Sequence, residues 1–299
     1  MVVTGGGGFI GRRLVRSLLE QGRRVRVIDR RPGAPEGCEH VLADLVDDDI
    51  TDALQGDVVF HLAGRAGVRG DDAETERQRL RDNVVATERV VRGTPKDVPL
   101  VFASSSSVYG GTLGRPCRED GPLAPRGGYA WSKLVAEQIC RARAFSGGLV
   151  HTARLFTVVG EGQRPDMALA LWADAVAAGR PVTVYGDLNR SRDFTDVAQA
   201  VDVLIRLSSV RSPTVVNVGT GVRQTVGTLL EAIGRQLGRQ PEIRLVDAPR
   251  QDPYATLADT TRLRMLADGA LLTDLVDVVG RYLMEDVSTM PTLTEGQLT

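Results

Sequence analysis

Short apolar stretches alternate along the first half of the chain with longer segments whose apolar residues recur every three or four positions. Strands are predicted where the apolar runs are short and continuous, at residues 1–4, 25–28, 57–62 and 99–103. Helices are predicted where the spacing is helical, over residues 9–21, 74–92 and 129–144. This alternation is typical of a parallel β-sheet covered by helices on both faces.

The pattern becomes less regular after Val159. Short strands are predicted at residues 182–185, 215–218 and 243–246, and helices over residues 167–178, 195–207 and 225–236. We therefore predict an α/β fold, with a doubly wound parallel sheet in residues 1–160 and a smaller mixed α/β lobe in residues 161–287, interleaved with the sheet. Residues 288–299 are polar, contain a proline and are predicted to form a flexible tail.

Composition narrows the possible function classes. The chain has 299 residues, and its 37 basic and 38 acidic side chains nearly cancel, which argues against a nucleic-acid-binding or membrane-binding surface. No apolar run is long enough to span a bilayer, and the chain enters a strand at once, so we expect neither a membrane anchor nor a signal peptide. Three widely spaced cysteines are typical of a reducing cytoplasm. The three histidines are isolated, so no metal site is expected.

A glycine-rich turn, TGGGGFIG, separates the first predicted strand from the first helix. Gly5, Gly8 and Gly11 follow the spacing GxxGxxG, a variant of the dinucleotide-binding fingerprint. Gly5 would make the tight turn, Gly8 would let the backbone approach a pyrophosphate, and Gly11 would let the helix pack against the strand. The helix start, at Phe9 and Ile10, offers free N–H groups to the phosphates. A flexible glycine loop is the alternative, which the strand-turn-helix context disfavours.

Asp29 ends the second predicted strand, where a carboxylate can accept hydrogen bonds from the adenosine ribose and repel a 2′-phosphate. This position favours NAD over NADP. Arg30 and Arg31 follow directly and are able to accommodate a 2′-phosphate, although a solvated turn is the preferred interpretation. Asp44 is a candidate for the adenine edge, with a simple loop carboxylate as the alternative.

Tyr129 and Lys133 form a YxxxK pair within a predicted helix, so both side chains lie on one face. A neighbouring ammonium favours the phenolate and is expected to lower the tyrosine pKa, which suits Tyr129 to remove a proton from a substrate hydroxyl. YxxxK alone is common on helix surfaces. The serine-rich segment SSSSVYGG at the end of a buried strand adds hydroxyl groups at the edge of a parallel sheet where ligands bind.

In this order, TGGGGFIG, Asp29, FHLAG, SSSSVYGG and YAWSK resemble the extended short-chain dehydrogenase/reductase family over nearly the whole chain. In the second half, LFTVVGEGQRPDM, VYGD, SRDF and Arg250 with TLAD resemble UDP-glucose and UDP-glucuronate 4-epimerases of that family. The resemblance implies a Rossmann-type NAD-binding domain in residues 1–160 and a nucleotide-sugar lobe in residues 161–287. It also implies a homodimer built through the helices at residues 74–92 and 129–144.

The resemblance assigns roles to individual residues. Ser105 is implied to carry a catalytic hydroxyl, Tyr129 to be the base and Lys133 to bind the nicotinamide ribose. The cofactor contacts predicted in all are Gly5, Gly8, Phe9, Ile10, Gly11, Asp29, Arg30, Asp44, Leu45, Leu62, Ala63, Asn83, Tyr129 and Lys133. The substrate contacts predicted are Arg69, Ser106, Thr157, Arg164, Tyr185, Arg192 and Arg250.

Among the substrate residues, Arg192 and Arg250 match arginines that bind the UDP diphosphate, as suits bidentate recognition by guanidinium. Ser106, Thr157 and Arg164 match positions near the C5 substituent of the sugar. The implied activity is an NAD-dependent 4-epimerase that acts on a UDP-hexose or UDP-hexuronate through a 4-keto intermediate. A UDP-glucuronate decarboxylase, a nucleotide-sugar dehydratase and a non-catalytic NAD-binding sensor are the alternatives.

Overall fold

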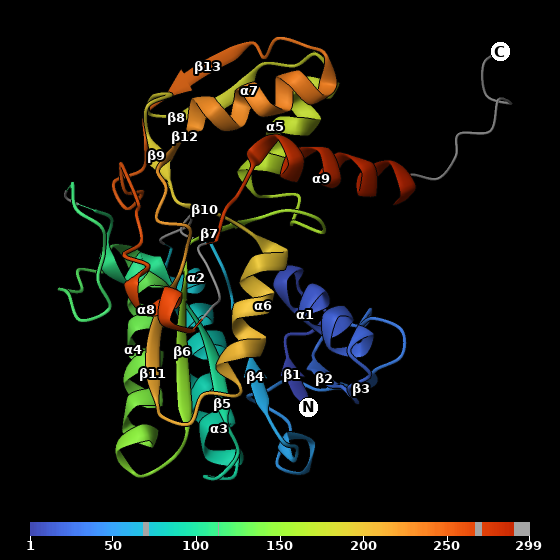
Figure 1. The fold of residues 1–299 in the computed structure, drawn as a ribbon, viewed down its shortest axis with the longest axis vertical. Helices are drawn as coiled ribbons and strands as arrows, with labels where there is room; N and C mark the ends of the chain where they lie inside the picture. Colours follow the sequence, from blue (N-terminus) through green and yellow to red (C-terminus); the bar gives the residue numbers. More distant parts are fainter. Residues whose placement is uncertain (68–71, 113, 267–270, 290–299) are drawn as a thin grey trace, which may run out of the picture.

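The computed structural model describes residues 1–67, 72–112, 114–266 and 271–289. A parallel sheet of seven strands forms the centre of the larger lobe (Figure 1). In spatial order its strands are β11 (Thr214–Val218), β6 (Val150–Leu155), β5 (Leu100–Ser105), β4 (Val59–His61), β1 (Val2–Thr4), β2 (Arg26–Asp29) and β3 (Glu39–Leu42). The predicted α/β class and the doubly wound parallel sheet are therefore confirmed.

The strand order reverses beside β1, which pairs with β2 on one side and with β4 on the other. The chain runs outward from β1 through β2 to β3, and then returns to build β4, β5, β6 and β11 on the opposite side. The loops that leave the carboxyl ends of β1 and β4 part at this point. In open α/β sheets such a crevice is where ligands bind.

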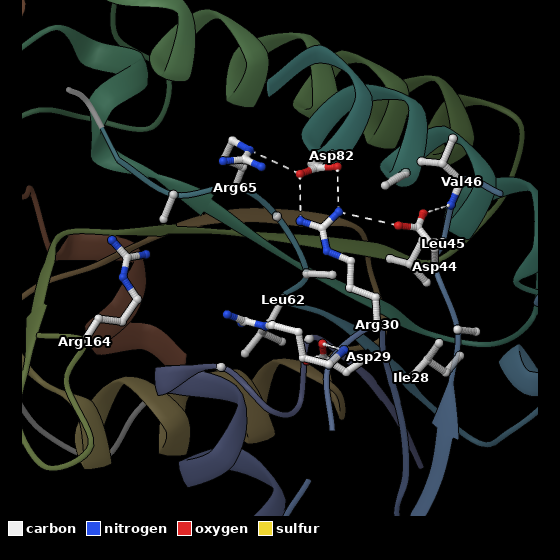
Figure 2. A pocket seen from close by; sticks show the side chains of 18 of the residues that line it. Ile28, Asp29, Arg30, Asp44, Leu45, Val46, Leu62, Arg65, Asp82 and Arg164 are labelled. Carbon is white, nitrogen blue, oxygen red and sulfur yellow. Dashed lines mark hydrogen bonds and ion pairs between the residues drawn. The ribbon is translucent and has the colours of Figure 1, made fainter. Parts of the chain in front are cut away.

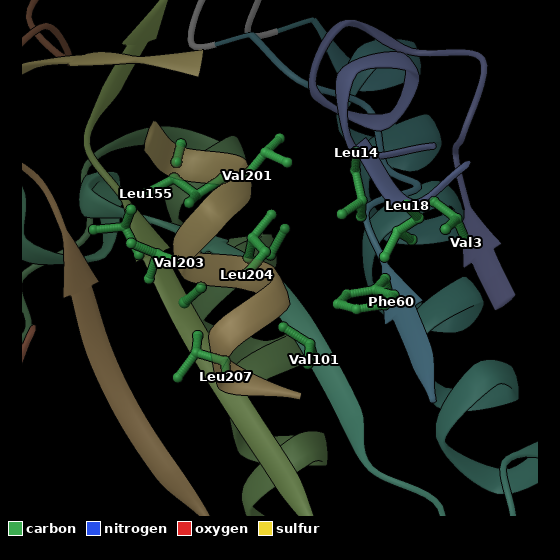
Figure 3. Close-up of a cluster of buried hydrophobic side chains, with 14 of the residues drawn as sticks. Val3, Leu14, Leu18, Phe60, Val101, Leu155, Val201, Val203, Leu204 and Leu207 are labelled. Atoms are coloured by element: carbon green, nitrogen blue, oxygen red, sulfur yellow. The ribbon is translucent and has the colours of Figure 1, made fainter. Parts of the chain in front are cut away.

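Helices cover both faces of the sheet, each through its own apolar cluster. On one face lie α1 (Phe9–Glu20) and α6 (Val197–Leu207), whose Leu14, Leu18 and Leu204 pack over Phe60 and Val101 (Figure 3). On the other face lie α3 (Ala86–Gly93) and α4 (Gly127–Phe145), which contribute Val90, Ala136 and Cys140 to the second cluster. Burial of these continuous apolar strands from both sides stabilises the sheet.

The smaller lobe has a separate core. Its helices are α5 (Ala168–Ala177), α7 (Val226–Leu237) and α9 (Leu275–Thr289), which pack around the parallel pair β8 (Val182–Tyr185) and β13 (Ile243–Val246). Short strand pairs connect the lobes: β7 (Thr157–Val159) with β10 (Phe194–Asp196), and β9 (Ser191–Arg192) with β12 (Gln224–Thr225). The remaining elements are η1 (Asp52–Leu54), α2 (Ala73–Arg79), η2 (Leu80–Val85), η3 (Ser106–Tyr109) and α8 (Thr261–Leu266).

Several elements differ from the sequence prediction. The helix predicted over residues 74–92 is α2, η2 and α3 in succession, and η2 is a π-helical segment. Strands β3 and β6 had no clear apolar signal. Strand β11 joins the main sheet and helix α6 packs against one face of it, although both elements follow residue 160. Residues 288 and 289 are helical, because α9 extends through them; the rest of the predicted tail lies outside the described residues.

Candidate active site

The glycine turn holds α1 unusually close to β1. Gly5 has a φ of 72°, and a Cβ on it would lie 2.6 Å from the backbone nitrogen of Ala63. A Cβ on Gly11 would lie 2.1 Å from the carbonyl oxygen of Gly5, so no larger residue fits there without moving the backbone. A Cβ on Gly8 would meet only the Gly5 carbonyl oxygen within 4 Å, at 3.2 Å, which leaves the remaining space beside the Gly8 backbone open.

A cavity of about 410 Å³ opens beside this turn, at the carboxyl ends of β1, β2 and β4 (Figure 2). Its lining includes these predicted cofactor residues: Gly5, Gly8, Asp29, Arg30, Asp44, Leu45, Leu62 and Ala63. Phe9, Ile10 and Gly11 do not line the cavity; Phe9 and Ile10 pack against the apolar cluster under α1. The predicted dinucleotide residues are thus largely brought together around one cavity.

The carboxylate of Asp29 is fixed by backbone donors. It accepts hydrogen bonds from the N–H of Gly7 at 3.1 Å and from the N–H of Arg31 at 3.0 Å. The guanidinium of Arg30 turns to a different acid, Asp82, and donates to both of its oxygens at 3.1 and 3.0 Å (Figure 2). Asp29 is therefore oriented at the cavity wall, while the charge of Arg30 is paired.

Asn83 lies in the π-helical segment and connects three parts of the site. Its amide donates to the hydroxyl of Ser132 in α4 at 2.9 Å and to the carbonyl oxygen of Arg65 at 3.1 Å. Its side-chain oxygen accepts from the N–H of Arg65 at 2.7 Å. Asn83 does not line the cavity; it holds the loop after β4 against the helix that carries Tyr129 and Lys133.

Tyr129 is half-buried near the start of α4 and lies close enough to Ser105, at the end of β5, for the serine hydroxyl to act on its pKa. Burial raises the pKa of Tyr129, and the contact with Ser105 and the charges of Arg164 and Arg79 oppose that rise without cancelling it. The expectation of a lowered tyrosine pKa is therefore not met by the residues of the chain alone. The structure does bring Tyr129 and Ser105, which were predicted separately, close to one another.

Lys133 lies one helical turn after Tyr129 and is almost fully buried. Its ammonium donates to the carbonyl oxygen of Ala103 at 2.8 Å and lies 4.9 Å from the ring centroid of Phe102. Desolvation lowers the pKa of Lys133 to about 8. A Cβ on Gly64 would come within 3.6 Å of the ammonium nitrogen, so Lys133 lies below the loop that borders the cavity.

The predicted substrate residues fall into separate groups. Arg164 lines the cavity, forms an ion pair with Asp166 at 2.9 Å and is close enough to act on the pKa of Tyr129. Ser106 begins η3 directly after Ser105, and Thr157 begins β7; both are half-buried. Tyr185 ends β8 and is 37% exposed. Arg69 lies outside the described residues.

Arg192 and Arg250, the two arginines predicted at a diphosphate, have different environments. Arg192 is largely buried and forms an ion pair with Asp252 at 2.6 Å. Arg190, which sequence reasoning missed, pairs with the other oxygen of Asp252 at 3.1 Å. Arg250 is exposed beside this cluster in the chain. Arg192 and Arg190 thus share one carboxylate, whereas no contact between residues in the described ranges orients the side chain of Arg250.

The family model described as "NAD dependent epimerase/dehydratase family" matches residues 1–219. The chain belongs to this family. It is 28% identical to the protein named "Uncharacterized UDP-glucose epimerase YtcB" of Bacillus subtilis (strain 168), over 99% of each chain. It is 33% identical to dTDP-6-deoxy-L-talose 4-dehydrogenase (NAD(P)(+)) of Kitasatospora kifunensis, over 83% of this chain and 82% of the relative.

Solved structures agree with the family assignment. MoeE5 in complex with UDP-glucose and NAD has a TM-score of 0.89 and 35% identity, covering 96% of this chain and 98% of that chain. MoeE5 has also been solved with UDP-glucuronic acid and NAD. As expected of an NAD-dependent family member, the Gly5 to Gly11 turn, the oriented carboxylate of Asp29 and the cavity between them fit a dinucleotide.

Within this NAD-dependent family fold, the structure adds site residues that sequence reasoning did not find. Arg65 and Asp82 both line the cavity and are paired at 3.3 Å. Arg65 follows β4 at the carboxyl edge of the sheet, a position that the strand pattern could have signalled. No local sequence pattern identifies Asp82 as a site residue, because its role depends on contact with Arg30, which is 52 positions away in the chain. Arg79 is buried in α2 and acts on the pKa of Tyr129.

Two further properties concern the part of the chain that the structure describes. In those ranges, no cluster of three or more histidine, cysteine, aspartate or glutamate side chains is arranged to hold a metal ion. The helices in the same ranges are too short or too polar for any of them to cross a lipid bilayer.

Proposed function

We propose that this family member is an NAD-dependent 4-epimerase of a UDP-linked hexose or hexuronate, which acts through a 4-keto intermediate. The observation that carries the proposal is that Tyr129 lies close enough to Ser105 for the serine hydroxyl to act on its pKa, one helical turn before buried Lys133, whose ammonium lies below the loop that borders the glycine-lined cavity. The half-buried phenol is of a residue type that can exchange a proton with a sugar hydroxyl.

In the proposed mechanism the protein handles the proton. The Tyr129 phenolate accepts the proton of the sugar 4-hydroxyl, while Ser105 holds that hydroxyl in line. When bound, NAD supplies the hydride acceptor and donor and a positive ring charge near the phenol. The 4-keto sugar then turns within the site, and Tyr129 returns its proton to the C4 carbonyl oxygen as the hydride returns to the other face of that carbon, which gives the epimeric alcohol. The net redox change is zero, so the chain has no need to exchange its dinucleotide in each cycle.

The proposed dinucleotide site uses the cavity and the turn. Gly8 and the N–H groups at the start of α1 would hold the pyrophosphate, and Asp29 would accept hydrogen bonds from the adenosine ribose. Lys133 would donate to the nicotinamide ribose, since its ammonium lies below the loop after β4. Burial lowers the pKa of Lys133, but a value of about 8 still leaves the ammonium mostly charged at neutral pH.

The proposed sugar site extends from Tyr129 to the smaller lobe. Arg192 would bind the diphosphate through its planar guanidinium, with Arg250 as a second candidate. Arg164, with Ser106 and Thr157, would lie near the C5 substituent; its influence on the pKa of Tyr129 supports a position close to the reacting carbon. A carboxylate at C5 would compete with Asp166 for Arg164, whereas a neutral group would leave that ion pair intact.

Product analysis tests the reaction type. The enzyme would be incubated with UDP-glucose, UDP-glucuronate and UDP-N-acetylglucosamine in separate reactions, and each product would be identified by NMR. We expect the 4-epimer of at least one of them at equilibrium. Release of carbon dioxide, or formation of an alkene, would instead assign the same site to a decarboxylase or a dehydratase.

Substitution of the base tests the catalytic assignment. We expect Tyr129→Phe to lower kcat by about 10²–10⁴-fold, because the proton acceptor is lost while the ring still packs against its neighbours. Dissociation constants for NADH, measured by calorimetry, should change by less than about threefold. Tyr282→Phe, the same change in α9 of the smaller lobe and outside the predicted site, serves as the matched control for kcat. Unchanged turnover in Tyr129→Phe would favour a binding protein without catalysis.

We also propose that two copies of the chain pair through a helix-face patch formed by Leu80, Val85, Trp131 and Val135. Their exposed fractions are 54%, 42%, 55% and 40%, which is high for apolar residues gathered on two neighbouring elements, η2 and α4.

We further propose a cytoplasmic location. It is supported by the free thiols of Cys38, Cys117 and Cys140, since a reducing compartment keeps thiols free.

A further inference from the structure

The choice between NAD and NADP is ambiguous at the end of β2. Asp29 favours a free ribose hydroxyl, whereas the next residue, Arg30, belongs to the residue type that binds a 2′-phosphate. Both residues line the cavity. We propose that Asp82 is a specificity-determining residue for the dinucleotide: it holds Arg30 and thereby prevents it from binding the 2′-phosphate of NADP. The inference rests on the dinucleotide site proposed above.

The geometry of the pair is bidentate. The two terminal nitrogens of Arg30 donate to the two oxygens of Asp82 at 3.1 and 3.0 Å, and one of them also approaches Asp44 at 3.5 Å (Figure 2). A planar guanidinium that meets a carboxylate in this way has its two strongest phosphate-binding donors occupied. A 2′-phosphate would have to displace Asp82 before Arg30 could bind it.

Burial makes that displacement costly. Asp82 is only 8% exposed, whereas the side chain of Arg30 is 46% exposed. If Arg30 turned to a phosphate, Asp82 would lose a charged partner in a poorly solvated place. Asp82 would also add its negative charge to that of Asp29 on the same cavity wall, and both would repel a 2′-phosphate.

Protonation of Asp82 does not break its ion pair with Arg30 at neutral pH. Burial raises the pKa of Asp82, but hydrogen bonds from Arg30 and Arg81 outweigh burial and hold its pKa below the ordinary value. The bond to Asp82 raises the pKa of Arg30. Both partners are therefore charged under physiological conditions, and the pair persists.

Two other arginines contact Asp82, so the proposal must distinguish the role of Arg30 from theirs. Arg65 donates to Asp82 at 3.3 Å and Arg81 at 2.9 Å, so Asp82 has three guanidinium partners. Arg81 is also held by Asp44 and Asp47, whereas Arg65 faces the same cavity as Arg30. If the proposal is correct, loss of the Asp82 charge favours NADP through Arg30, which follows Asp29 directly, and not through Arg65.

The test uses the full chain, freed of co-purified dinucleotide, and calorimetric titration with NADH and NADPH. For Asp82→Asn, which keeps the shape of the side chain, we expect the ratio of the NADPH to the NADH dissociation constant to fall about tenfold or more. In Arg30→Gln/Asp82→Asn the ratio should return to near its wild-type value. In the matched control Arg65→Gln/Asp82→Asn the gain should persist.

The outcomes separate this inference from the proposed function. If the wild-type chain binds neither nucleotide, the dinucleotide site itself is wrong and the inference fails with it. If wild type binds NADH but Asp82→Asn weakens both nucleotides equally, Asp82 has only a structural role and the inference alone fails. A gain in NADPH binding that survives the loss of Arg30 would also overturn it.

Discussion

Burial shifts the pKa values of several ionisable side chains around the site. Desolvation raises the pKa of Tyr129 and lowers the pKa of Lys133 to about 8. A third case is His61, at the end of β4, which is fully buried and bonded to hydroxyls of Thr4 at 2.7 Å and Thr87 at 3.0 Å. Burial, and to a smaller extent the positive charge of Lys133, lowers the pKa of His61 to about 3.

This pKa predicts acid sensitivity from a single residue. The unfolded chain takes up a proton on His61 near pH 6.5, whereas the folded chain does so only near pH 3. The contribution of neutral His61 to the free energy of unfolding is therefore fully present above pH 6.5 and is lost as the pH falls from 6.5 towards 3. Within that window we expect His61 to contribute a loss of about 1.4 kcal/mol per pH unit. Urea unfolding of wild type and His61→Gln at pH 6.5, 5.5 and 4.5 measures it. Parallel pH profiles for the two proteins would contradict the prediction.

At the scale of elements, the site depends on how closely α1 approaches the end of β1. The approach exists because Gly11 lacks a side chain, as the carbonyl oxygen of Gly5 lies where a Cβ would be. A second dependence is the π-helical segment η2, which places Asp82 toward Arg30 and Asn83 toward Ser132. Such π segments are frequently found at functional sites, and this one connects the adenosine side of the cavity with helix α4.

A glycine substitution tests the close approach of α1. Gly11→Ala should destabilise the chain by about 1–3 kcal/mol, because the methyl group meets backbone rather than a movable side chain, and it should abolish NADH binding. Gly227→Ala is the matched control, since Gly227 is also helical and its nearest contacts to an added Cβ are 3.4 Å or more. The control should be neutral or stabilising by up to about 1 kcal/mol. Thermal melts and calorimetric titrations give both quantities.

At the scale of the whole molecule, the chain passes repeatedly between the two lobes. The buried carboxylate of Asp193 joins these passages: it accepts hydrogen bonds from the N–H groups of Thr220 at 2.8 Å, Gly221 at 2.9 Å and Ala258 at 3.0 Å. The segments that carry Arg192 and the end of β11 are thereby held together. In the proposed mechanism, this connection would let Tyr129 on α4 and Ser105 on β5 meet a sugar whose diphosphate is held by Arg192.

The helix-face patch predicts the oligomeric state. We expect the wild-type chain to sediment as a dimer at micromolar concentration and Trp131→Glu to sediment as a folded monomer, because a buried charge is not tolerated in an apolar contact. Phe145→Glu is the control: Phe145 is 79% exposed at the far end of α4, outside the patch, and its substitution should leave the dimer intact. A monomeric wild-type chain would contradict the proposed pairing.

Signals that are local in the chain were readable without a structure. The GxxGxxG spacing, the carboxylate that ends β2 and the YxxxK pair each involve residues a few positions apart, so strand and helix geometry alone determines where they lie. Much of the alternation of strands and helices along the chain followed from the same periodicity, although strands β3 and β6 did not. Strand β6 was missed because it contains Arg154, which forms a buried ion pair with Glu137 of α4. A charged residue interrupts the apolar pattern that identifies a central strand.

Tertiary structure alone decided which distant residues meet. The partners Arg30 and Asp82 are 52 positions apart, Asn83 and Ser132 are 49 apart, and Arg192 and Asp252 are 60 apart. These contacts depend on strand order and on the π-helical segment, neither of which short-range periodicity specifies. The raised pKa of Tyr129 also depends on tertiary structure. Burial of the phenol outweighs the effect of the neighbouring cations only once the whole fold surrounds it. Sequence therefore determined the chemistry available, and the fold determined which groups are free to use it.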